Sequence, residues 1–210
     1  MNQILFPALI LILTASFALP SSETAERARE MTSNLEKIEN LIDKTVKELR
    51  EAIDQLNRIA AESDKPRDAF EDYTDQLKDY KDVQETLSDR INRFRTVADE
   101  RFKDWESDLA KMEGELKNIS QERMNKAKKE YETVDKKVRA IGAKLTKAVD
   151  KLQEVQTYFA TELNAASIQA ASKVTDAAKQ SADEVLQALE DMKKTYTQLK
   201  NDTAETKSKD

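Results

Sequence analysis

The stretch Met124–Phe159, "MNKAKKEYETVDKKVRAIGAKLTKAVDKLQEVQTYF", carries apolar residues at alternating steps of three and four. Such spacing places a single apolar stripe along one side of a helix and is the seam of a coiled coil. The stretch therefore predicts a long helix that packs against other helices. The positions of the stripe are Met124, Ala127, Tyr131, Val134, Val138, Ile141, Leu145, Ala148, Leu152, Val155 and Phe159.

Three further segments carry apolar stripes of the same kind. They run from Leu35 to Ile59, from Phe70 to Ile119 and from Ile168 to Leu199. Of the 210 residues, 36% are charged, and the chain holds only two Gly and three Pro. That composition is typical of long helices, and it leaves too few turn-forming residues for a sheet protein. The sequence therefore predicts an all-α fold.

The boundaries between the stripes predict how the helices are arranged. Pro66 suits the first turn of a helix, and a turn is expected within Gly114–Ser120, where the residues weaken a helix. The phase breaks within Leu163–Ile168, where Asn164 can cap a helix. Short connections make neighbouring helices antiparallel. We expect an elongated antiparallel four-helix bundle with coiled-coil packing, formed by residues 23–200 with helices at about 23–62, 66–116, 120–162 and 165–200, and a flexible tail at 201–210.

An alternative stays open at the last boundary. No Gly or Pro marks the junction between the third and the fourth stripe. The two stripes can therefore merge into one uninterrupted helix, and the fold would then consist of three long helices.

The first residues of the chain have the pattern of a secretory signal. Ile4–Leu19 is almost wholly apolar and uncharged, and it is shorter than the roughly 20 residues that span a bilayer. Small residues at Ser16 and Ala18 favour cleavage after Ala18. We expect a signal peptide at 1–18, a link at 19–22 and an exported protein, periplasmic or extracellular. The alternative is a protein anchored in the membrane by an uncleaved N-terminal segment.

The densely charged stretch Ser88–Glu106, "SDRINRFRTVADERFKDWE", holds the only tryptophan of the chain. Two consecutive steps of four between apolar residues replace the heptad spacing here. Such a stutter locally unwinds a supercoil. It predicts that Trp105 lies in the core while Arg101 and Asp108 stay outside it. The expected turn would then bring Val134 or its neighbours opposite Trp105.

Two interpretations of this stretch compete. The structural one, which we favour, is a solvated charged face over a large buried aromatic residue. The functional one is an interaction patch around Arg90, Arg93, Arg95 and Trp105, because Trp and Arg are enriched among interface anchors.

The same residues resemble a known family. "LSDRI", "VADERFKDWESDL", Tyr131 and "ELNAASI" are similar to the bacterial envelope family known as domain of unknown function twenty-nine fifty-nine. The resemblance covers roughly Phe70–Leu199. It implies an exported, all-helical protein and no particular activity. Many members look like lipoproteins, and this chain departs from them because it has no Cys.

A basic stretch, Arg123–Lys151, holds ten Lys or Arg and four Asp or Glu. One interpretation is a weak contact with an anionic membrane surface. We favour electrostatic complementarity inside the bundle instead, with the acidic stretch Glu62–Asp89 as partner.

The missing residue types exclude several kinds of chemistry. Without Cys or His there is no thiol catalysis, no usual general base near pH 7 and no common zinc site. We therefore expect no enzymatic activity, no metal and no cofactor. The net charge of −6 argues against nucleic acid as a partner. The expected function is an exported scaffold or adaptor of the cell envelope that binds a protein partner or itself. The alternative is an amphipathic lipid-binding helical bundle.

Overall fold

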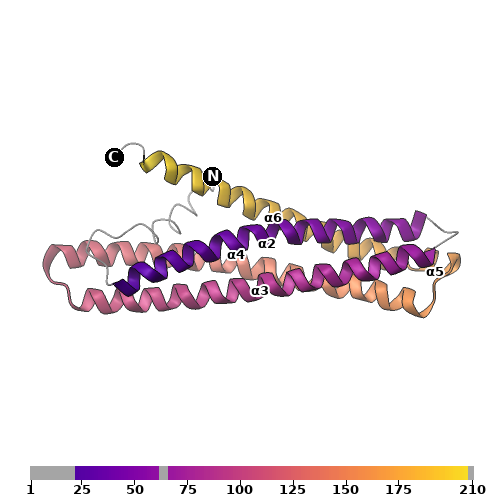
Figure 1. The fold of residues 1–210 in the computed structure, drawn as a ribbon, viewed down its shortest axis with the longest axis horizontal. Coiled ribbons are helices and arrows are strands. Elements are labelled where there is room, and N and C mark those ends of the chain that lie inside the picture. The colour runs from indigo at the N-terminus through magenta and orange to yellow at the C-terminus, as the bar shows by residue number, and fades with distance from the viewer. Residues whose placement is uncertain (1–21, 62–65, 208–210) are drawn as a thin grey trace. The chain divides into compact units, whose positions relative to one another are not determined.

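The computed structural model describes residues 22–61 and 66–207, and nearly all of them are helical (Figure 1). No strand occurs within these ranges, and none of their helices is long and apolar enough to cross a membrane. The prediction of an all-α bundle is confirmed. The expected signal peptide lies outside the described residues. The helices are α2 (Ser22–Ala61), α3 (Pro66–Ala110), α4 (Gly114–Thr161), α5 (Ala165–Ala170) and α6 (Ser172–Lys207).

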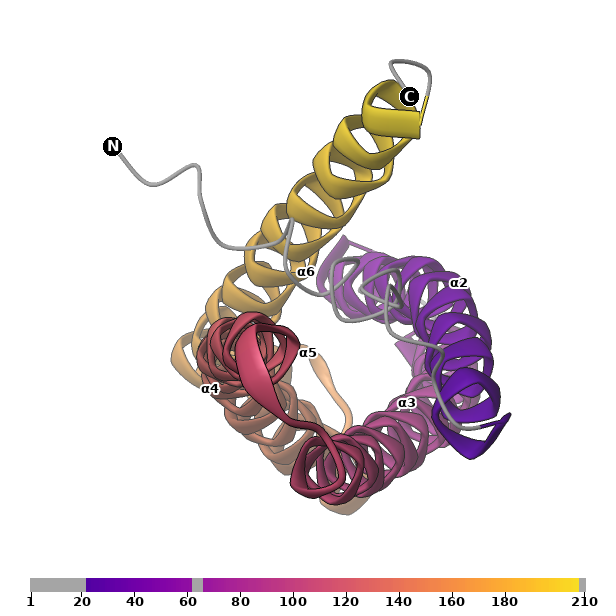
Figure 2. The ribbon, with the colours of Figure 1, turned by 90° about the vertical axis from the view of Figure 1, so that its left-hand side faces the viewer.

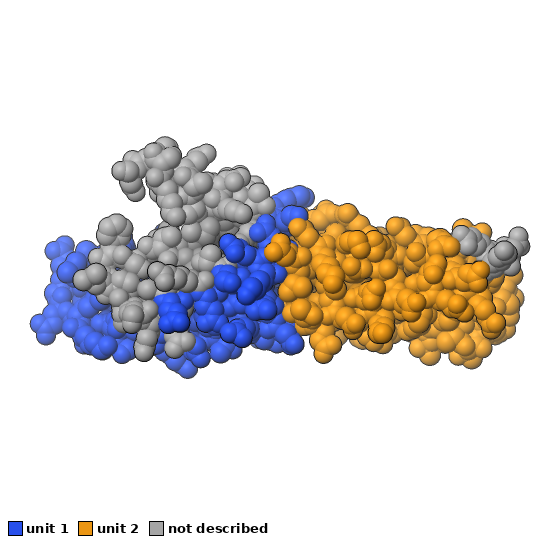
Figure 3. Space-filling model, in the orientation of Figure 1, with its two compact units in different colours: residues 1–39, 89–139, 192–210 blue, residues 40–88, 140–191 orange. Residues whose placement is uncertain are grey.

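The chain divides into two compact units (Figure 3). Unit 1 consists of Met1–Glu39, Asp89–Arg139 and Met192–Asp210, and unit 2 of Asn40–Ser88 and Ala140–Asp191. Each unit is therefore assembled from pieces of several helices that are far apart in the sequence. The elongation expected from the sequence stays a prediction.

The core of unit 2 takes residues from four helices. Leu49 of α2, Leu77 of α3, Leu152 of α4 and Val185 of α6 are each no more than 1% exposed, as the heptad stripes predict. Polar contacts between α2 and α3 join Arg58 to Asp72 and Glu48 to Gln76. The contact that lies earlier on α2, at Glu48, lies later on α3, at Gln76, so the two helices are antiparallel.

The core of unit 1 is rich in aromatic residues. Phe94, Phe102 and Trp105 of α3 are each at most 7% exposed, and Tyr131 of α4 is 8% exposed. The Tyr131 ring lies between the rings of Phe94 and Phe102, with centroid distances of 6.3 Å and 5.7 Å respectively. Aromatic pairs at such distances add to the stabilisation that burial provides.

The turn between α3 and α4 comes earlier than the sequence suggested. α3 ends at Ala110 rather than near 116, and α4 begins at Gly114 rather than near 120 (Figure 2 shows this short link facing the viewer). Gly114 has a φ of +70°, a left-handed conformation that favours glycine. The glycine therefore marks the end of the turn and not its beginning.

The boundary after α4 excludes the alternative of three long helices. α4 ends at Thr161, and Asn164 caps α5 by accepting a hydrogen bond from the Ser167 backbone N–H. The Ser167 hydroxyl in turn accepts from the Asn164 backbone N–H at 2.8 Å, which completes a capping box. Ala171 separates α5 from α6, which continues to Lys207. The expected flexible tail at 201–210 is thus helical through Lys207.

Candidate interaction site

The three arginines of the predicted interaction patch are directed to different helices. In unit 1, Arg90 Nη1 donates to Asn34 Oδ1 of α2 at 3.1 Å, and Arg93 Nη2 contacts Glu30 Oε1 of α2 at 2.8 Å. Arg95 instead pairs with Asp135 of α4. Each guanidinium therefore joins two helices of the same unit.

Trp105, the fourth residue of the predicted patch, is 7% exposed. Its indole Nε1 donates to Ser120 Oγ at 3.0 Å, across the link between α3 and α4. The prediction that Trp105 is a core residue is confirmed. The prediction that Val134 or its neighbours face the indole is wrong, because the early turn brings Ser120, near the start of α4, to this level. Trp105 and the three arginines do not form one surface.

Arg101 overturns part of the stutter interpretation. Its side chain is buried, with a residue exposure of 2%, although the altered spacing predicted that it lies outside the core. Among the described residues, neither its Nε nor its Nη1 has a hydrogen-bond partner. Burial lowers the pKa of the guanidinium to about 10, which still leaves it protonated at neutral pH. Unit 1 therefore encloses a cation.

Asp135 is shared by two arginines. It accepts from Arg139 Nε at 2.6 Å, one turn away on α4, and pairs with Arg95 of α3. Burial in itself raises the pKa of the Asp135 carboxyl, but the hydrogen bonds from Arg139 and Arg95 and their charges outweigh it, so that its pKa lies below the ordinary value. This site is a structural ion-pair network.

The basic stretch on α4 finds partners that differ from those predicted. Lys128 pairs with Glu106 of α3, and Lys147 lies 3.9 Å from Glu184 of α6. No described residue of the acidic stretch Glu62–Asp89 pairs with the basic stretch. The physical reason is the antiparallel packing, which places the first part of the basic stretch beside the end of α3 in unit 1, as the contacts of Tyr131 with Phe102 and of Lys128 with Glu106 show.

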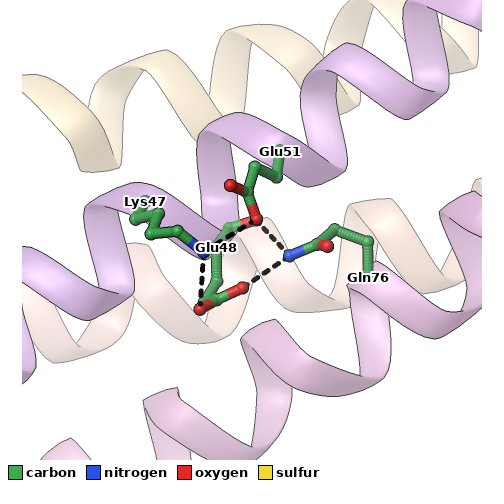
Figure 4. A network of polar contacts seen from close by, with 4 residues as sticks. All are labelled: Lys47, Glu48, Glu51 and Gln76. Carbon is green, nitrogen blue, oxygen red and sulfur yellow. Dashed lines mark hydrogen bonds and ion pairs between the residues drawn. The ribbon is translucent and has the colours of Figure 1, made fainter.

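A polar cluster joins α2 and α3 in unit 2 (Figure 4). Glu48 is 7% exposed, and its carboxylate accepts a hydrogen bond from Gln76 Nε2 at 2.6 Å. The Lys47 ammonium lies 3.4 Å from the same carboxylate and 3.1 Å from Glu51. The hydrogen bond to Glu51 raises the pKa of Lys47 above its ordinary value. The buried carboxylate is thus paired on both of its oxygens.

Two large apolar side chains are exposed at the start of α4. Leu116 is 69% exposed and Ile119 is 44% exposed. The sequence placed both in the buried stripe of the second helix, which is wrong, because the turn comes before them and α4 turns this side outward. Being three residues apart, they are neighbours on the helix surface.

The sequence reasoning missed two buried charged residues, Arg101 and Glu48. A signal existed for Arg101, because the uninterrupted heptad phase places it in the core. No comparable signal marked Glu48, which lies beside the stripe rather than in it. Among the described residues, no group of three or more His, Cys, Asp or Glu side chains could hold a metal ion.

Comparisons with known proteins identify a family. No curated protein and no solved structure matches the chain. A family model described as "Protein of unknown function" matches residues 21–205, which extends the resemblance seen at Phe70–Leu199 to both sides. Since the match covers most of its residues, the chain belongs to this family, DUF2959.

Proposed function

We propose that the protein is an exported helical scaffold or adaptor of the cell envelope, without catalytic activity, that binds a protein partner. The proposal rests on the observation that charged side chains form ion pairs between helices. Arg93, Arg95 and Arg50 each join two helices through an ion pair, with Glu30, Asp135 and Glu190 respectively. Residues that could have formed a reactive cluster instead hold helices together, as expected for a structural protein.

The exposed pair Leu116 and Ile119 supports the adaptor role. Large apolar side chains that are adjacent and exposed provide area that a partner can remove from water. Glu122 and Arg123, three and four residues after Ile119, are neighbours on the helix surface and are exposed as well, so they give a polar rim. Such an apolar centre with a polar rim is the usual composition of a protein interface.

The experiment is a capture of partners from the native envelope with the tagged full chain. We compare the wild type with the double variant Leu116→Ser, Ile119→Ser and with the matched control Lys117→Ser, Asn118→Ser. The proposal expects one stoichiometric partner with the wild type and the control, and at least about tenfold less with the apolar variant, the loss expected from removing interface anchors worth more than 1 kcal/mol.

Two results would contradict the proposal. Equal recovery of the partner by both double variants would show that Leu116 and Ile119 do not belong to the interface. Recovery of the protein in the cytosol with Met1 retained, determined by mass spectrometry, would exclude export. Retention of Met1 at the membrane would instead favour an uncleaved anchor.

A further inference from the structure

Arg101 stands apart from the other arginines of its helix segment. Arg90, Arg93 and Arg95 each donate to an acceptor on a neighbouring helix. Arg101 is more deeply buried than these three, and among the described residues its Nε and Nη1 have no acceptor. Since Nε carries one N–H and Nη1 carries two, three N–H donors of this buried cation have no hydrogen-bond acceptor among the described residues.

The surroundings of Arg101 on its own helix are apolar. Val97, Ala98, Phe102 and Trp105 lie within four residues of it, and none is more than 7% exposed. Val97, Ala98 and Trp105 are three or four residues from Arg101 and therefore lie on the same side of α3 as its side chain. A charge that loses its hydration without gaining a partner costs several kcal/mol, so buried guanidinium groups are normally paired with an anion.

The described carboxylates near Arg101 in sequence do not supply that anion. Asp99 is exposed, and Glu100 and Asp104 lie at half-exposed positions. None of them gives Nε or Nη1 of Arg101 a hydrogen bond. Burial lowers the pKa of Arg101, and no carboxylate among the described residues contributes to the shift.

We propose that Arg101 is a binding site for a phosphate group, which its N–H donors hold inside unit 1. A planar guanidinium matches two oxygens of such a group at once. The anion is either free in solution or the headgroup of an amphiphile. The proposal is independent of the scaffold role.

Trp105 provides the reporter for the test. It lies four residues after Arg101 on α3, and positions with this spacing are neighbours on a helix. The full chain is titrated with inorganic phosphate at constant ionic strength, with chloride as the background salt. Parallel titrations use dodecyl phosphate and uncharged dodecyl maltoside, both below their micelle concentrations. Tryptophan emission and the midpoint of thermal unfolding are measured in each titration.

The site predicts a saturable change in emission and a rise of the unfolding midpoint with the phosphate group, because a ligand that binds only the folded state stabilises it. Arg101→Met keeps the volume of the apolar stem and removes the donors. We expect it to bind the phosphate group about 10- to 100-fold more weakly, the loss expected for hydrogen bonds to a charged group. Arg93→Met, which removes an arginine that is 64% exposed, is the matched control and should bind as the wild type does.

The titrations with inorganic phosphate and with dodecyl phosphate distinguish the two sources of the anion. Equal affinity for inorganic phosphate and dodecyl phosphate identifies a site for a free anion, whereas binding of dodecyl phosphate alone identifies a headgroup site. No response to either probe, an equal response to dodecyl maltoside, or an equal loss in both Met variants overturns the proposal. Should Arg101→Met fail to fold, Arg101→Lys decides: it retains the charge without the planar fork, and wild-type affinity in this variant overturns the assignment.

Discussion

Tyr73 and Tyr80 lie seven residues apart on α3, are both 0% exposed, and differ in one respect: only Tyr73 has a partner for its hydroxyl. The Tyr73 hydroxyl donates to the Leu152 carbonyl oxygen of α4 at 2.8 Å. The Tyr80 hydroxyl has no partner among the described residues. Burial raises the pKa of both phenols, so both stay neutral at physiological pH.

Replacing each tyrosine by Phe tests the value of that hydrogen bond. Tyr73→Phe should lower the free energy of unfolding by about 1 kcal/mol, the usual net contribution of a hydrogen bond. Tyr80→Phe should leave it unchanged or raise it, because the variant removes a buried polar group that has no partner. Urea denaturation followed by circular dichroism measures both. An equal loss in the two variants would mean that Tyr80 has a partner in solution.

Trp105 should behave as a core residue that also holds the end of the α3–α4 hairpin. Trp105→Ala should cost about 3–5 kcal/mol, the range for removing a large aromatic side chain from a core. Ser120→Ala should cost about 1 kcal/mol, because it removes the acceptor of the indole N–H. The emission of the folded protein should be blue-shifted and should move to longer wavelength on unfolding. Red-shifted emission in the folded state would contradict the burial of Trp105.

The two glycines of the chain form a matched pair. A Cβ added at Gly114 or at Gly142 would meet no atom within 4 Å, so only the backbone distinguishes them. Gly114→Ala should destabilise by about 1–2 kcal/mol, because its left-handed conformation is costly for any residue with a Cβ. Gly142→Ala, inside α4, should stabilise by about 0.5–1 kcal/mol. Thermal unfolding measures both, and a gain at Gly114 would contradict its φ of +70°.

The Asp135 network should make stability depend on pH in the acid range. The folded-state pKa of Asp135 lies below its ordinary value, so the carboxylate contributes stability above its unfolded-state pKa, about 3.9. That contribution is lost as the pH falls through the lower, folded-state pKa. Asp135→Asn should therefore show a smaller loss of stability between pH 5 and the acid range than the wild type. Identical pH profiles would exclude a net depression of this pKa.

The heptad pattern predicted the helices and their cores because it depends only on local spacing. Every described position of the third stripe is buried or half-buried, and Leu145, Ala148, Leu152 and Val155 are at most 1% exposed. The pattern could not place the turn after α3, because Gly114 suits the end of a turn as well as its start. It also ended the last helix too early, since the polar residues after Leu199 contain no Gly or Pro to stop it.

The candidate site was less predictable than the fold. The sequence identified Trp105 as a core residue. It also grouped Trp105 with three arginines in one patch, but the partner of each arginine lies on another helix and cannot be inferred from local spacing. The burial of Arg101 depends on packing that brings distant helix segments together. The heptad phase by itself placed Arg101 in the core, whereas the stutter in the apolar spacing favoured a position outside it, where a lone cation keeps its hydration.

The hydrogen bond between Glu48 and Gln76 has a consequence for how α2 and α3 find their correct alignment. An apolar heptad seam nearly repeats itself after a shift of seven residues, so sliding one helix by a heptad preserves much of its contact. Such a shift would bring Glu48 opposite Ala69 or Val83 in place of Gln76, and both of these are buried apolar residues. The Glu48 carboxylate would then be buried without its Gln76 partner, which destabilises the shifted alignment, whereas the apolar contacts alone would not distinguish it from the native one. We infer that this pair selects one alignment of α2 and α3 among those that the apolar seam alone would allow.

In the double variant Glu48→Leu, Gln76→Leu, single cysteines placed on α2 and α3 of this cysteine-free chain should cross-link at offsets of seven residues as well as at the native pairing. Cross-linking at the native pairing alone would show that other contacts set the alignment.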